Sequence, residues 1–134
     1  MLAKVGSEIG VSPWIKIDQP LIDAFADVID DHQFIHVDPD RSKAETPFDG
    51  TIAHGFLVLS LLSKMYYEAV PPIQGTAMGI NYGFDKIRFL SPVPSGTRVR
   101  GRFRLEEVDE RMPGELTFRF AVSVELYGAH KPAL

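Results

Sequence analysis

The sequence predicts an α+β fold in which a curved antiparallel sheet wraps around one long apolar helix. Two observations lead to this prediction. Between residues 52 and 65 apolar side chains cover every face of a helix, which is typical of a helix enclosed by other elements. The second half of the chain alternates apolar and polar residues with a period of two, as one-sided antiparallel strands do. A single helix followed by long amphipathic strands indicates a helix packed inside a sheet.

The elements before the central helix are short. Residues 10–17 are predicted to form the first strand. Asp18 then provides an N-cap, and Pro20 falls in the first turn of a helix, where its missing N–H does no harm. Apolar residues at helical spacing continue this helix to about residues 30–31: Leu21, Ala24, Phe25, Val28 and Ile29.

Three strands are expected after the central helix. Apolar residues alternate over 80–89, a Pro-rich and Gly-containing turn spans 92–96, and further alternating runs cover 98–105 and 116–126. In the second of these strands the polar partners are all arginines: Arg98, Arg100, Arg102 and Arg104.

Length and composition indicate one soluble domain over residues 1–134. The chain is 45% hydrophobic and 24% charged, and it contains no repeat or long linker. A net charge of −4, with acids and bases interspersed, disfavours nucleic acid and membranes as partners. The absence of cysteine excludes disulfides, thiolate nucleophiles and Cys-bound metals. With no signal-like start and no apolar segment of membrane-spanning length, we expect a cytoplasmic protein.

Residues 30–38 contain the densest group of chemically active side chains. Asp31 and His36 are five residues apart across a bend, so both can converge on one water and exchange protons with it. A capped, solvated turn explains the same pattern. Segment 50–56 opens the central helix, where free N–H groups attract a carbonyl oxygen and Gly55 allows close backbone approach. Tight packing, with His54 as a hydrogen-bonding residue of the first turn, is the alternative.

Segments 31–39 and 47–56 together resemble the MaoC-like, (R)-specific enoyl-CoA hydratase family of hot-dog-fold proteins. The family's hydratase motif has Asp, any residue, Asn, Pro, an aliphatic residue and His. Asp31 and His36 match its first and last positions, and Ile35 matches the aliphatic one. The resemblance extends through residues 81–93 and so covers most of the chain.

The sequence departs from the family pattern at three places. Asp30 stands where a Gly commonly precedes the catalytic Asp, although Asp tolerates a left-handed conformation better than most residues. Gln33 and Phe34 replace the Asn-Pro pair, and Gln33 still offers an amide. Relatives usually continue through another strand after residues 127–134. If that strand is missing, an exposed sheet edge would favour association.

The resemblance implies reversible addition of water to a trans-2-enoyl-CoA, giving an (R)-3-hydroxyacyl-CoA, with no metal or redox cofactor and in a homodimer. Asp31 and His36 would hold the water, and the Gly55 N–H would receive the thioester oxygen. Six further residues are expected to contact the substrate: Gln33, Phe34, His54, Leu57, Lys86 and Arg88. Of these, Lys86 and Arg88 would pair with the phosphates of coenzyme A. The four arginines of strand 98–105 are interpreted as a solvated strand face.

Three other interpretations are open. A hot-dog thioesterase would use a carboxylate and water on the same substrate class. Zinc could be held by His32, His36 and His54 with Asp31 or Asp38. A third possibility is a subunit that binds acyl-CoA without turning it over.

Overall fold

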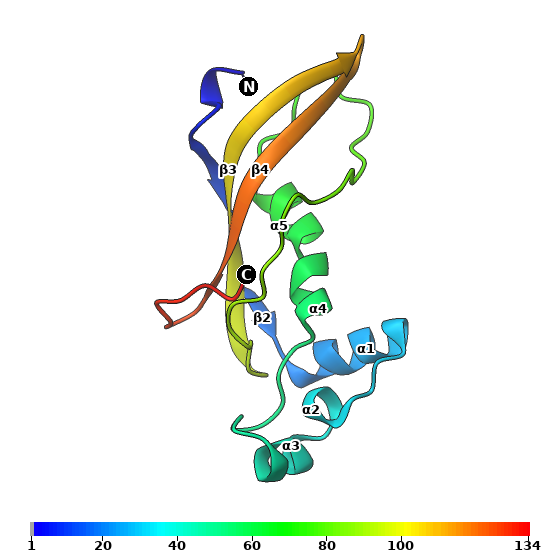
Figure 1. Ribbon diagram of the computed structural model, residues 1–134, viewed down its shortest axis with the longest axis vertical. Coiled ribbons are helices and arrows are strands. Elements are labelled where there is room, and N and C mark those ends of the chain that lie inside the picture. The colour runs from blue at the N-terminus through cyan, green and yellow to red at the C-terminus, as the bar shows by residue number, and fades with distance from the viewer. Residues whose placement is uncertain (1) are drawn as a thin grey trace.

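The computed structural model describes residues 2–134 and confirms the mixed α+β prediction (Figure 1). The N-terminal part contains η1 (Leu2–Lys4), β1 (Glu8–Val11), β2 (Ile15–Ile17), α1 (Gln19–Ile29), α2 (Phe34–Val37) and α3 (Pro39–Glu45). The remaining elements are α4 (Gly55–Ser60), α5 (Leu62–Ala69), β3 (Thr97–Met112) and β4 (Glu115–Leu126). Within residues 2–134, no helix combines the length and apolar character needed to span a bilayer.

The sheet is antiparallel and is built around β3. Strand β4 pairs with one edge of β3, while β1 and β2 follow one another along the opposite edge. The predicted strand at 10–17 is therefore two strands, because Pro13 has no N–H to continue the ladder. At the interruption, the Ser12 hydroxyl accepts a hydrogen bond of 2.9 Å from the Gly101 N–H.

The central helix begins later than predicted and is divided at Leu61 into α4 and α5. Ile52 is extended and bridges Pro94, so the helix does not include it. Met65 is fully buried against the sheet, but Phe56 is 65% exposed. The expectation of a helix enclosed on every face is thus wrong for the described residues, because the sheet covers only one side of it.

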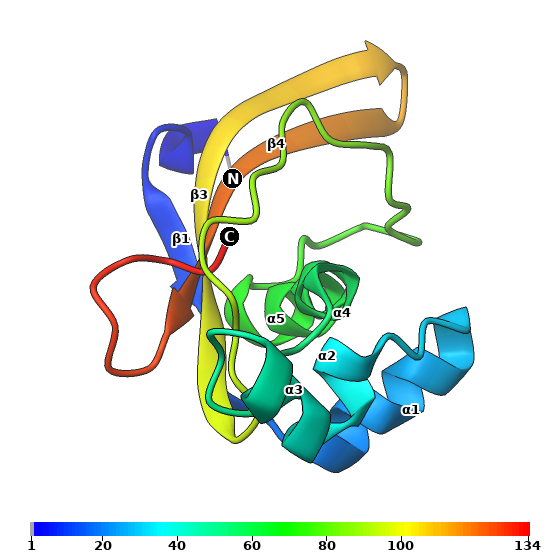
Figure 2. The same cartoon turned by 60° about the horizontal axis from the view of Figure 1, so that its bottom comes forward.

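The strand predicted at residues 80–89 is absent from the described chain. Ile80, Tyr82 and Phe84 alternate in sequence but are all exposed, and the segment pairs with none of the four strands. Alternation indicates which side of a strand is apolar, but a strand also requires a neighbour that satisfies its backbone. Figure 2 shows this light-green segment crossing the concave side of the curved β3–β4 ribbon.

Backbone hydrogen bonds of the kind that join strands begin at Leu90. Its N–H donates to the carbonyl of Ala133 at 2.9 Å, and the Ala133 N–H donates to the carbonyl of Val124 in β4 at 2.8 Å. The Val124 N–H in turn donates to the Leu134 carbonyl at 3.0 Å. Residues 133–134 therefore lie between β4 and the segment at residue 90.

Candidate active site

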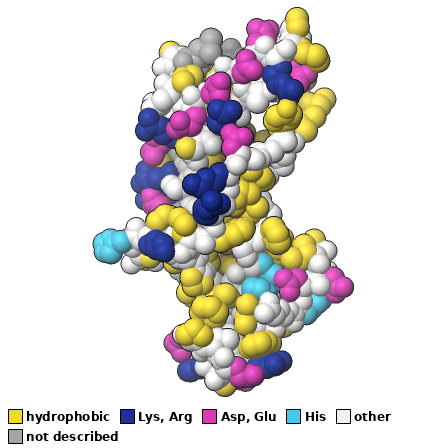
Figure 3. All heavy atoms as spheres, in the orientation of Figure 1, with side chains coloured by type: hydrophobic (Ala, Val, Ile, Leu, Met, Phe, Trp, Pro, Cys, Tyr) yellow, Lys and Arg dark blue, Asp and Glu magenta, His cyan; other side chains and the backbone are white. Residues whose placement is uncertain are grey.

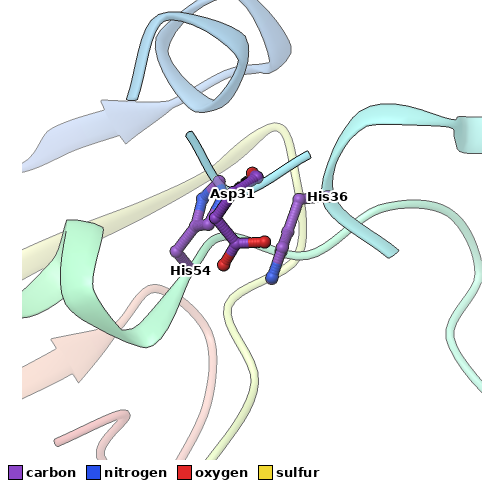
Figure 4. A group of neighbouring side chains, drawn as sticks. All are labelled: Asp31, His36 and His54. Atoms are coloured by element: carbon purple, nitrogen blue, oxygen red, sulfur yellow. Dashed lines mark hydrogen bonds between the residues drawn. The ribbon is translucent and has the colours of Figure 1, made fainter. Parts of the chain in front are cut away.

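Asp31 is positioned by the end of α1. The helix begins at Asp18, whose carboxylate accepts a hydrogen bond of 3.0 Å from the Leu21 N–H, as predicted. It ends at Asp30, which adopts the left-handed conformation with φ 55° and ψ 42°. This confirms that Asp supports the turn at the position where the family commonly has Gly. The reversal directs Asp31 toward α2 and the start of α4 (Figure 4).

His36 lies on the single turn of α2 and is 7% exposed. Its Nδ1 lies 2.7 Å from the carbonyl oxygen of Ile52. A carbonyl oxygen only accepts, so Nδ1 carries the proton and the neutral ring leaves Nε2 as an acceptor. Burial lowers the pKa of His36 below its ordinary value, which favours this neutral form at pH 7.

His54 contacts both of these residues. Its ring stacks on that of His36, with the ring centroids 3.8 Å apart and the planes inclined by 22°. Its Nε2 lies 3.0 Å from the backbone carbonyl of Asp31 and donates to it, whereas the buried Nδ1 has no hydrogen-bond partner within residues 2–134. His54 therefore connects the Asp31 backbone to the His36 ring, and its expected contact with substrate stays a prediction.

The donor atoms of Asp31, His36 and His54 all lie within 4.8 Å of one another (Figure 4). The other atoms proposed for a metal site lie elsewhere: His32 pairs with Asp27 at 2.8 Å, and Asp38 caps α3. The lone pairs of stacked imidazoles lie in nearly parallel planes, whereas ligands of a tetrahedral zinc must converge. Of the five residues named for a metal site, only Asp31, His36 and His54 lie together.

A cavity of about 230 Å³ lies beside His36. Its walls are mostly apolar and come from the start of the central helix and from the chain before β3. The lining residues are His36, Ile52, Ala53, Gly55, Val58, Phe89, Leu90, Ser91, Pro92, Val93 and Ala133. Figure 3 shows histidine atoms near the narrowest part of the molecule, next to hydrophobic side chains.

Gly55 forms the part of the cavity wall nearest the start of α4. Gly55 is the first residue of α4, so its N–H precedes the intrahelical hydrogen bonds. The ring of Phe89 packs directly on this glycine, since a Cβ added there would lie 3.0 Å from two ring carbons. Val58 and Phe89 were not among the predicted contacts. The helical and alternating patterns contained both residues but did not indicate that they face one cavity.

Several predicted substrate contacts do not line this cavity. Gln33 is exposed, and Phe34 packs beneath the guanidinium of Arg41, 4.1 Å from the ring centroid. Leu57 is 2% exposed and belongs to the hydrophobic core. Lys86 and Arg88 are exposed on the irregular segment after α5.

The arginines of β3 are mostly paired with carboxylates. Arg100 and Arg102 both hydrogen-bond Glu125, and Arg102 also contacts Glu8 at 3.0 Å. The hydrogen bond from Arg102 is the main cause that lowers the pKa of Glu125. This pairing agrees with the interpretation of a solvated strand face.

Residues 2–124 match the family described as the MaoC-like domain. The chain belongs to the MaoC-like dehydratase family. This MaoC-like chain is 52% identical over 132 residues to nodulation protein N of Rhizobium leguminosarum bv. viciae, covering 98% of this chain and 82% of that protein. It is 41% identical over 133 residues to 3-hydroxyacyl-thioester dehydratase Z of Mycobacterium tuberculosis, covering 99% and 87%.

A solved structure confirms the hot-dog fold of this MaoC-like chain. The (R)-hydratase from A. caviae involved in PHA biosynthesis superposes with a TM-score of 0.75 at 23% sequence identity. The superposition covers 96% of this chain and 89% of that structure.

The two histidines with opposite pKa shifts predict opposite effects of pH on folding. Because burial lowers the pKa of folded His36, the unfolded chain binds this proton more readily, and the free energy of unfolding should decrease as pH falls below about 6.5. A hydrogen bond to Asp27 raises the pKa of His32, so its contribution is present below about 6.5 and lost as pH rises through the folded value. Urea unfolding between about pH 5 and 8 should show that the free energy of unfolding falls less toward acid pH in His36→Gln than in the wild type. In His32→Gln it should fall more than in the wild type. The same pH dependence in all three proteins would contradict the assignment.

Proposed function

We propose that this chain catalyses the reversible hydration of a trans-2-enoyl-CoA to the (R)-3-hydroxyacyl-CoA. One observation carries the proposal: the carboxylate of Asp31 and the unprotonated Nε2 of neutral His36 lie together, and His36 borders an apolar cavity. A relative is named a 3-hydroxyacyl-thioester dehydratase and a structural neighbour an (R)-hydratase, and both names describe this class of reaction.

In the proposed reaction, a water lies between Asp31 and His36. As its oxygen bonds to C3 of the substrate, one of its protons passes to the pair and the C2–C3 π electrons move toward the thioester. C2 then takes up a proton from the pair, which returns to its starting state. We assign the proton to the pair as a unit, because both side chains lie within reach of the same water. Dehydration is the same sequence in reverse.

Gly55 has a separate role in this proposal. Its N–H stabilises the negative charge that builds on the thioester oxygen when water adds to C3. The apolar walls at Val58 and Phe89 would contact the acyl chain. The proposal includes a homodimer in the cytoplasm and no cofactor other than the coenzyme A of the substrate.

The first experiment follows the ultraviolet absorbance of the enoyl thioester with short and medium trans-2-enoyl-CoA substrates. We expect the absorbance to fall to an equilibrium value, with product that is oxidised only by a dehydrogenase specific for the (R) alcohol. A thiol reagent in parallel reactions detects free coenzyme A, whose release would favour the thioesterase. Absence of turnover at every chain length, in folded protein that binds acyl-CoA, would favour the binding subunit and contradict the proposal.

A further inference from the structure

Gln19, the first residue of α1, forms side-chain hydrogen bonds that connect α1, α2 and the chain before α4. Its Nε2 donates to the backbone carbonyl of His36 at 2.7 Å and to the carboxylate of Asp23 at 2.8 Å. Its Oε1 accepts a hydrogen bond from the hydroxyl of Thr51, a residue that is 4% exposed. One amide therefore uses both of its hydrogens and its oxygen within the protein.

Two of these bonds reach the two segments that orient the His36 ring. The first segment is α2, which carries His36 and has only four residues, too few to hold a helix by itself. The second is the extended chain at residues 51–52, where the Ile52 carbonyl accepts the Nδ1 proton of His36. The Ile52 N–H also donates to the Ile35 carbonyl at 3.0 Å, which closes the connection between the segments.

We propose that Gln19 is a positioning residue for the hydration reaction: its amide fixes the His36 backbone relative to Thr51 and so keeps Nε2 of His36 beside Asp31. This inference rests on the proposed function. It adds a residue that lies outside the hydratase motif and contacts neither the cavity nor Asp31. Without the amide, α2 can shift relative to residues 51–52, and the ring then loses the single orientation that the Ile52 carbonyl selects.

Four variants separate positioning from general stabilisation. Gln19→Ala removes all three hydrogen bonds. Gln19→Glu retains an acceptor for Thr51 but places a carboxylate oxygen against the His36 carbonyl, and Thr51→Val removes only the hydroxyl. Asp23→Ala is the matched control, because Asp23 is exposed and bonds the same Nε2 without contacting His36.

Steady-state kinetics on an enoyl-CoA should show kcat about tenfold to a hundredfold lower for Gln19→Ala, with KM within about twofold, since misplacement of a reacting group costs rate rather than binding. Gln19→Glu and Thr51→Val should move kcat in the same direction. The double variant Gln19→Ala/Thr51→Val should be no slower than Gln19→Ala, because both act through one bridge. Asp23→Ala should match the wild type. Wild-type kcat in a folded Gln19→Ala variant would overturn the inference, and if that variant does not fold, wild-type kcat in Gln19→Glu or Thr51→Val would do so.

A measurement without substrate keeps this inference distinct from the proposed function. Nitrogen-15 NMR of the imidazoles should find His36 as the Nδ1–H tautomer in the wild type and as a mixture of tautomers in Gln19→Ala. The groups facing His36 are Asp31 from the end of α1 and His54 from the start of α4, and both remain in every variant. If no enoyl-CoA is hydrated but the tautomer changes as expected, the proposed function fails and the role of Gln19 in orienting His36 stands. An unchanged tautomer would overturn that role even in an active enzyme.

Discussion

Replacement of Asp31 by Asn or of His36 by Ala is expected to lower the rate of enoyl-CoA hydration by about 10² to 10⁴-fold. Asn retains the size of Asp31 but its amide does not take up a proton, and Ala removes the Nε2 acceptor of His36. The apolar walls of the cavity remain in both variants, so KM should change much less than kcat. Initial rates of the change in enoyl absorbance, measured at saturating substrate, test this prediction.

The double variant and a neighbouring histidine provide the controls. If Asp31 and His36 act on one water, the variant lacking both should be about as slow as the slower single variant, because residues that work as a unit are not additive. His32→Ala should have activity near that of the wild type, since His32 is exposed and pairs with Asp27. Hydration at the wild-type rate in either single variant would refute the proposed water-holding pair.

The local parts of the candidate site could be predicted from the sequence. The spacing of Asp31 and His36 within one bend is a property of six neighbouring residues, and Asp18 and Asp30 mark the two ends of the helix before it. These features depend on capping and on backbone conformation, which short-range pattern reports well. Gly55 was identified for the same reason, as the residue that opens a helix.

The supporting contacts could not be predicted in this way. His54 is eighteen positions beyond His36, and its place against the His36 ring depends on long-range contacts: its Nε2 bonds the Asp31 carbonyl, and its ring centroid lies 5.3 Å from that of Phe25. Gln19 is seventeen positions before His36, and in sequence it is simply the residue after an N-cap. A pattern of apolar residues does not specify which polar groups the tertiary fold brings together.

The predictions that were wrong about the fold have a related cause. Residues 80–89 have the alternation of a strand, but the described chain provides no strand beside them. The apolar run at 52–65 was interpreted as uniformly helical, whereas Ile52 pairs with Pro94 before the helix starts. Periodicity reports the preferred face of an element, while backbone pairing decides whether and where that element forms.

Gly10→Ala is expected to destabilise the protein by about 1–3 kcal/mol or more. Gly10 lies in β1 opposite Phe103 of β3, and its backbone faces Ala69 at the end of α5. A Cβ at this position would overlap the carbonyl oxygen of Ala69 and lie 2.6 Å from its carbonyl carbon. Both obstructing atoms belong to the backbone, so no side-chain rotation relieves the overlap. Either β1 leaves β3 or the last turn of α5 moves off the sheet. Urea unfolding at pH 7 measures the loss.

Gly83→Ala is the matched control for this substitution. Gly83 lies in the irregular segment, and a Cβ there meets nothing within 4 Å, so its free energy of unfolding should stay within about 0.5 kcal/mol of the wild-type value. The difference between the two variants isolates the contact from the general effect of replacing glycine on the unfolded chain. Equal stability of both variants would mean that α5 does not press on β1 in solution. A large loss at Gly10 alone would show that this close approach fixes α5 on the sheet.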